Sequence, residues 1–211
     1  MGQSVPRTED PRLLRGNGRY VDDIRLSNEC HAYMLRPPHA HARIVSIDCE
    51  AARSMPGVIA VYTGADWVAD GHGQHPAGHN RVRRDGSGLY VPTRHAIAHK
   101  EVKVTGDIVA MIVAESINLG KDAAEQIIVE YDLLPVITEG TQARAEGAPV
   151  LHEGCDDNEG YFYTAGEKEA VEAIIATAHH VTRLNTKINR ITANTMEPRS
   201  CIGDYDHRFE R

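Results

Sequence analysis

Three histidines in one glycine-rich stretch are the residues whose type and spacing most suggest chemistry. His72, His75 and His79 fall within GHGQHPAGH, and imidazole nitrogens are common metal ligands. However, no carboxylate or cysteine stands at a matching spacing, and a glycine-rich loop holds ligands poorly because its backbone has many accessible conformations. The stretch is therefore interpreted as a polar surface loop, and no metal ligand is predicted in it.

The segment MEPRS places a carboxylate and a guanidinium two residues apart. Glu197 and Arg199 flank Pro198, which fixes φ and favours an extended chain. Residues two apart on a strand face the same side. The pair can therefore serve a buried ion-pair network or bind a polar ligand, and the network is the favoured interpretation.

Other chemical motifs are absent or fail on their context. GNGRYV at 16–21 looks like the start of a dinucleotide loop, but no apolar strand precedes it and no third glycine follows. The four cysteines form no C-x-x-C pair, and neither a G-x-x-x-x-G-K-[ST] nor a G-x-S-x-G motif occurs. The adjacent His179 and His180 are given a structural role at a helix end. We predict no catalytic, cofactor-binding or metal-binding residue in this chain.

Composition and charge indicate a globular protein without a nucleic-acid face or a membrane span. Hydrophobic residues make up 41% and charged residues 25% of the chain, with one tryptophan and two phenylalanines, so the core is expected to be aliphatic. The net charge of −7 arises within residues 146–172, which hold eight acids and one lysine. The basic run RVRR at 81–84 is interpreted as a solvated loop. Without a long apolar run or a secretory signal, a cytoplasmic protein with reduced thiols is expected.

Hydrophobic periodicity predicts an α+β domain over residues 29–137. Apolar patterns of strand type predict strands at 31–36, 42–50, 58–66, 101–104 and 107–116, and a last one from 128. A short helix that ends at Pro56-Gly57 and a second helix from 118 lie between them. Residues 68–100 are predicted to be a long loop. The irregular spacing of the elements favours α+β over regular βαβ units.

Three further regions complete the predicted organisation. Residues 1–28 form a charged opening with apolar anchors, expected to strap the chain onto a larger assembly. Residues 138–165 are interpreted as an acidic linker, with docking on a basic partner as the alternative. Within 166–211 we predict an amphipathic helix and strands at 180–192 and 201–205. A helix and two strands rarely bury enough surface alone, so this region is expected to be the incomplete start of another module.

Six segments, taken in order, carry a resemblance to a known family. They are RTEDPRLLRGNGRYVDDI, HAYMLRPPHAHARIVSID, MPGVIAVYTGAD, VTGDIVAMIVAES, AAEQIIVEYDLLPVI and MEPRSCIGDYD. Together they closely resemble the N-terminal part of the large, molybdopterin-binding subunit of the xanthine dehydrogenase / aldehyde oxidase / carbon monoxide dehydrogenase family. The resemblance implies that residues 29–137 form the α/β hammerhead domain and that residues from 166 begin the molybdopterin-binding domain.

The resemblance also implies a chemistry for the full subunit. Members hydroxylate aldehydes or N-heterocycles with oxygen from water, or oxidise carbon monoxide, at molybdenum held by molybdopterin, expected here in its cytosine dinucleotide form. Electrons then pass through two [2Fe-2S] clusters to FAD. The implied partners are the remainder of the molybdenum subunit, the iron-sulfur and FAD subunits, and further copies of the complex.

No catalytic or cofactor-binding residue is carried over, because the family's counterparts are expected downstream of Arg211. This chain alone is therefore expected to be inactive. In the strap, four arginines would pair with acids of the same large subunit while Leu13, Leu14 and Tyr20 fill apolar niches; the arginines are Arg7, Arg12, Arg15 and Arg19. The alternative is a separately encoded, non-catalytic hammerhead module that scaffolds or binds partner subunits.

Overall fold

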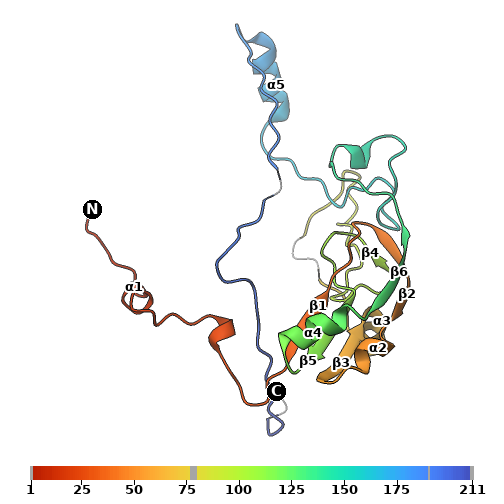
Figure 1. The fold of residues 1–211 in the computed structure, drawn as a ribbon. Coiled ribbons are helices and arrows are strands. Elements are labelled where there is room, and N and C mark those ends of the chain that lie inside the picture. The colour runs from red at the N-terminus through yellow and green to blue at the C-terminus, as the bar shows by residue number, and fades with distance from the viewer. Residues whose placement is uncertain (1, 77–79, 190, 210–211) are drawn as a thin grey trace. The chain divides into compact units, whose positions relative to one another are not determined.

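The chain divides into two compact units, which are described one at a time. The structure is a computed structural model that describes residues 2–76, 80–189 and 191–209 (Figure 1). One unit runs from Cys30 to Ala170, and the other joins the residues up to Glu29 with those from Val171 onward. No helix among the described residues has both the length and the apolar character needed to cross a membrane.

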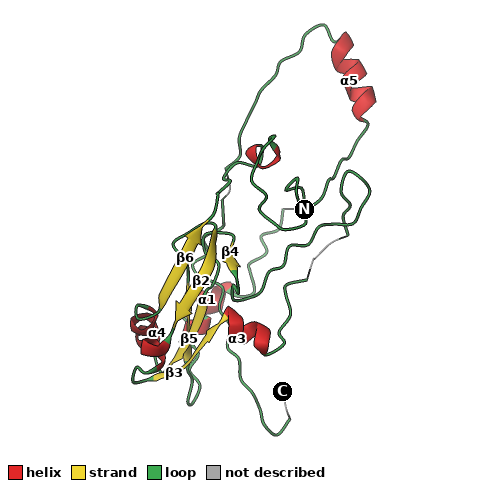
Figure 2. Ribbon diagram, turned by 90° about the vertical axis from the view of Figure 1, so that its right-hand side faces the viewer, coloured by secondary structure: helices red, strands yellow, loops and turns green. Residues whose placement is uncertain are grey.

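The Cys30–Ala170 unit is built on two antiparallel sheets of three strands each (Figure 2). One sheet has the order β1-β5-β3 and the other the order β4-β2-β6. The strands are β1 (His31–Leu35), β2 (Ala42–Asp48), β3 (Val58–Thr63), β4 (Glu101–Val102), β5 (Ala110–Ala114) and β6 (Ile128–Leu133). All lie where sequence periodicity predicted strands, and the α+β class is confirmed.

The pairing of these strands is entirely non-local. β5 is the central strand of its sheet and pairs β1 with His31 opposite Ala114, and β3 with Val61 opposite Ile112. β2 pairs with β4 and β6, with an irregularity between Ile44 and Ser46. None of the first three strands pairs with another of the three. The apolar sequence AMIVA fits the central position of β5, where alternate residues are fully buried.

Three short helices connect the strands. They are α2 (Glu50–Arg53), α3 (Gly64–Ala69) and α4 (Ile117–Ala124). α3 is absent from the prediction, which continued a strand to residue 66. Thr63 and Asp66 form a capping box at its start, and this polar pair ends the strand and begins the helix. α4 begins at Ser116, whose hydroxyl accepts from the Leu119 N–H at 3.3 Å.

The core is aliphatic and made of small side chains, as the composition predicts. Its main cluster lies between the β1-β5-β3 sheet, α2 and α4, and its buried members are Cys49, Ala52, Val61, Ala110, Ile112, Ala123, Ala124 and Ile127. A smaller cluster of Ala42, Val102 and Val109 supports the β4-β2-β6 sheet. Leu35 and Val129 pack against both clusters, so the two sheets share one interior.

Residues 138–165, predicted as a linker, belong to this unit and pack against the long loop. The Phe162 N–H donates to the Val82 carbonyl at 2.9 Å, and the Tyr90 N–H donates to the Gly160 carbonyl at 3.0 Å. RVRR at 81–84 is thus not a freely solvated loop. Opposite charges on the two segments, together with these backbone bonds, hold them together.

The other unit contains little regular structure. Its elements are α1 (Asp10–Leu13), a short 3₁₀ helix η1 (Val21–Asp23) and most of α5 (Lys168–Thr177), a helix that the sequence predicted. The predicted strands at 180–192 and 201–205 are wrong for the described residues, which form no strand there. A strand needs a neighbour for its backbone hydrogen bonds, and the described part of this unit offers none. The apolar face of α5 is also exposed, with Ile174 at 69%.

Candidate functional site

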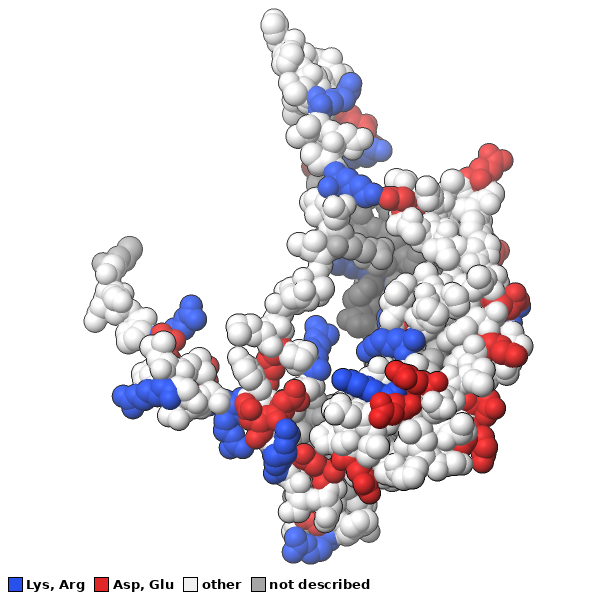
Figure 3. All heavy atoms as spheres, viewed as in Figure 1, with Lys and Arg blue, Asp and Glu red and all other residues white. Residues whose placement is uncertain are grey.

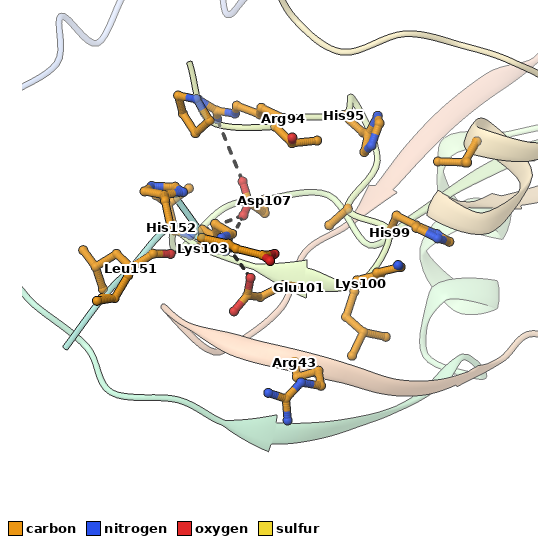
Figure 4. Close-up of a pocket in the computed structure, with 18 of the residues that line it drawn as sticks. Arg43, Arg94, His95, His99, Lys100, Glu101, Lys103, Asp107, Leu151 and His152 are labelled. Atoms are coloured by element: carbon orange, nitrogen blue, oxygen red, sulfur yellow. Dashed lines mark hydrogen bonds and ion pairs between the residues drawn. The ribbon is translucent and has the colours of Figure 1, made fainter. Parts of the chain in front are cut away.

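A cleft of about 1110 Å³ lies in the Cys30–Ala170 unit (Figure 4). Its walls come from the long loop at 90–95, from residues 98–107 around β4, and from 150–153 of the acidic segment, with Arg43 and Ile44 of β2 at one side. In Figure 4 a dashed line joins Arg94 to Asp107, and another runs between Lys103 and Glu101. The cavity is built by residues 43–44, 90–107 and 150–153, which are distant in sequence.

The turn VKVTGD after β4 shapes the cleft. One carboxylate oxygen of Asp107 accepts from the backbone N–H groups of Lys103 at 2.8 Å and Val104 at 3.2 Å. Gly106 takes a φ of +102°, a region that favours glycine, and its carbonyl accepts from the Arg36 guanidinium. The turn thereby aims both Lys103 and Asp107 into the cavity.

Glu101 links two basic side chains of the cleft region. Its carboxylate accepts from the Lys103 ammonium at 2.9 Å and from Nε2 of His41 at 3.0 Å. Burial by itself would raise the pKa of Glu101, but the bonds and charges of Lys103 and His41 outweigh it and lower that pKa. Glu101 is therefore ionised near neutral pH. Lys103 also donates to the Leu151 carbonyl at 3.1 Å, which ties in the third wall.

His41 is buried, with 7% of its surface exposed, between two acceptors. Its Nδ1 lies 2.7 Å from the Pro135 carbonyl, and its Nε2 faces Glu101. A carbonyl and an ionised carboxylate can only accept hydrogen bonds. His41 therefore joins the start of β2, β4 and the chain after β6.

His152 lines the cleft beside this network. Burial lowers the pKa of His152, and the nearby Lys103 charge lowers it further. Its imidazole is therefore neutral near pH 7 and stands 6.1 Å from the Tyr90 ring, centroid to centroid. Side chains of both charges line the cleft, among them Arg94, Lys103, Glu101 and Asp107, and Figure 3 shows acidic and basic side chains interspersed over the visible face.

Two of the three histidines of the glycine-rich stretch are described. No group of three or more potential metal ligands occurs among residues 2–76, 80–189 and 191–209. The His72 ring lies 4.5 Å from the Trp67 ring, centroid to centroid, and the His75 backbone N–H donates to the Arg94 carbonyl at 2.9 Å. His79 lies outside the described residues.

Glu197 and Arg199 form no described ion pair with each other, and both are exposed. The Glu197 carboxylate instead accepts from the Val21 N–H at 2.9 Å. Within this unit it bonds the N-terminal segment at the start of η1. His180 contacts the Thr182 hydroxyl at 3.0 Å and no catalytic partner among the described residues.

Sequence reasoning missed the network of His41, Glu101 and Lys103. The two partners of His41, Glu101 and Pro135, are 60 and 94 residues away from it along the chain. HAHAR offers two histidines of equal appearance, and nothing in it marks His41 as the buried one. The available signal is the pair of strand patterns at β2 and β4, because His41 directly precedes the first and Glu101 begins the second.

Comparison with known proteins gives a consistent result. The family model described as aldehyde oxidase and xanthine dehydrogenase, a/b hammerhead domain, matches residues 15–135. The nicotine 6-hydroxylase large subunit of Paenarthrobacter nicotinovorans is 35% identical over 211 residues, 100% of this chain and 25% of that protein. The carbon monoxide dehydrogenase large chain of Afipia carboxidovorans is 30% identical over 98% of this chain and 26% of its own length.

A solved structure supports the same relationship. Quinoline 2-oxidoreductase from Pseudomonas putida 86 is 41% identical, with a TM-score of 0.60, over 67% of this chain and 17% of that one. The chain spans about a quarter of the length of the two curated relatives above. This chain belongs to the aldehyde oxidase and xanthine dehydrogenase family, and its two-sheet unit carries the α/β hammerhead domain.

Proposed function

We propose that this chain works as the N-terminal part of the large subunit of a molybdenum hydroxylase. In the full protein, residues 29–137 would be the hammerhead domain, 138–165 its connection, and residues from 166 the start of the molybdopterin-binding domain. The full enzyme would oxidise a small substrate, an aldehyde, an N-heterocycle or carbon monoxide, with oxygen from water. The observation that carries the proposal is the match of the whole chain, at 35% identity, to about a quarter of a nicotine 6-hydroxylase large subunit.

Lys103 of the cleft is not free to bind the cofactor that the family implies. A pterin dinucleotide carries a pyrophosphate, which needs free donors. Lys103 is already bonded to Glu101 and to the Leu151 carbonyl, while the Asp107 carboxylate faces the same space. We therefore derive no step of the reaction through this cleft. The molybdopterin, in its cytosine dinucleotide form, would be held by the remainder of the subunit, with [2Fe-2S] clusters and FAD on partner subunits of a cytoplasmic, oligomeric complex.

The role proposed for this chain is to build and hold that subunit. The strap at 1–28 is supported by the bond from Val21 to Glu197, which fastens it to MEPRS in the region assigned to the start of the cofactor domain. Deleting residues 1–28 from the full subunit should therefore weaken assembly and cofactor loading. Normal loading of the truncated subunit would contradict the strap.

The decisive test of the family chemistry is the metal content of the natively purified complex. Molybdenum and iron should be present together, with a flavin spectrum from the partner. A matching preparation from cells grown with tungstate in place of molybdate is the control, since it should keep iron and flavin but lose activity. A fully matured, full-length protein that lacks both metals would overturn the proposal.

A further inference from the structure

The basic run and the acidic segment of the Cys30–Ala170 unit meet in a defined cluster, here named the arginine clasp. Glu159, only 9% exposed, lies at its centre. Its carboxylate accepts from Nε of Arg84 at 3.0 Å and lies 3.2 Å from a guanidinium nitrogen of Arg144. Arg83 pairs with Asp157. A buried carboxylate is thus neutralised by two guanidinium groups from different segments.

Aromatic rings complete the clasp. The Arg84 guanidinium lies 3.6 Å from the centre of the Phe162 ring, and that of Arg81 lies 4.3 Å from the centre of the Tyr163 ring. Both distances are within the range of cation–π attraction. Alternate arginines of RVRR therefore contact rings and acids, while Val82 pairs with Phe162 through the backbone.

The clasp is continuous with two walls of the cleft. The Leu89 N–H donates to the Arg81 carbonyl at 3.0 Å, so the clasp leads directly into the loop that contains Tyr90. The Tyr90 hydroxyl donates to the Glu153 carbonyl at 2.7 Å, which joins the loop wall to the acidic-segment wall. No strand of either sheet takes part in these contacts.

We infer that the arginine clasp is a salt-sensitive latch that holds these two walls of the cleft together and opens without unfolding the sheets. Exposed ion pairs are weak and are screened by salt. Glu159 is the exception, because losing its partners would leave a nearly buried charge uncompensated. The contacts therefore act as a unit that is either closed or open. Arg81, Val82 and Arg84 are exposed in the closed form, so opening frees the backbone of RVRR for cleavage and exposes His152.

The test uses trypsin, which cuts after the arginines of RVRR, on the 211-residue chain with the acidic side altered. Glu159→Gln should raise the rate of cleavage at 81–84 roughly five- to thirtyfold, the range given by one to two kcal/mol of lost closure. Arg144→Gln should give a smaller rise, since one guanidinium remains. The matched control is Asp156→Asn. This substitution removes the same charge from the same segment, and Asp156 forms none of the ion pairs described above.

Two further measurements separate a latch from general loosening. In the unaltered chain, about 1 M NaCl should raise cleavage at 81–84 and carbethoxylation of His152, since the Debye length is then only ~3 Å. The unfolding midpoint followed by the fluorescence of Trp67 should change little. Equal cleavage rates in Glu159→Gln and in the control would overturn the latch. It would also be overturned if the unfolding midpoint fell together with the rise in cleavage.

Discussion

Replacing His41 by leucine should strongly destabilise the Cys30–Ala170 unit. The substitution keeps a side chain of similar size but removes both ring nitrogens, leaving the Pro135 carbonyl and one side of Glu101 without their partner. The two contacts measure 2.7 and 3.0 Å, and one of them is made to a carboxylate. Hydrogen bonds to charged groups contribute about 1.5–3 kcal/mol each. Glu101 keeps Lys103 and leucine gains apolar burial, so the net loss should be about 3 kcal/mol.

Urea unfolding measures this loss, because the single tryptophan, Trp67, lies in α3 of the same unit. With a slope of about 2 kcal/mol per M, the midpoint should fall by about 1.5 M. His39→Leu is the control. His39 lies two residues away and contacts the Tyr131 ring edge-on at 5.0 Å, and its loss should cost under ~1 kcal/mol.

A His41→Leu variant as stable as the unaltered chain would refute the stabilising role given to the two contacts of His41.

Three other outcomes follow from the structure. Gly64→Ala should prevent stable folding, because a Cβ at that position would stand 2.1 Å from the Ala98 carbonyl oxygen; normal expression and an unchanged midpoint would contradict this. Ser116→Ala should cost about 1 kcal/mol through the lost cap of α4, measured by the same unfolding assay. The lowered pKa values of Glu101 and His152 mean that the unfolded chain binds more protons. Stability should therefore fall as the pH drops below about 6.5 and again as Glu101 protonates; His152→Gln should remove the first step, and a flat profile would exclude it.

Periodicity predicted the strands and α4 because their burial alternates along the sequence itself. AMIVA in β5 and VIAVYT in β3 carry that pattern in their letters. α3 was missed although Thr63 and Asp66 spell its capping box, since the apolar run before it suggested a longer strand. The strands predicted after residue 180 are wrong for the described residues. Alternation of apolar and polar residues shows only that a segment is able to form a strand, and a strand forms only when a second strand is present to pair with it.

The cleft and the arginine clasp could not be predicted in the same way. Glu101 and His41 are separated by 60 residues, and Arg84 and Glu159 by 75. Charge alone suggested that RVRR and the acidic segment each faced solvent or a foreign partner. Their mutual neutralisation depends on a chain reversal set by the two sheets, which composition does not encode.

The strand pairing has a consequence for synthesis on the ribosome. β1 and β3 both pair only with β5, and β2 pairs only with β4 and β6, which are synthesised later. At about 5–20 residues per second, β1 therefore remains without a partner for roughly 4–16 s after it is made. During that interval three apolar segments are available to neighbouring nascent chains. Chaperone capture of the growing polypeptide should consequently end only when the segment beyond residue 133 emerges.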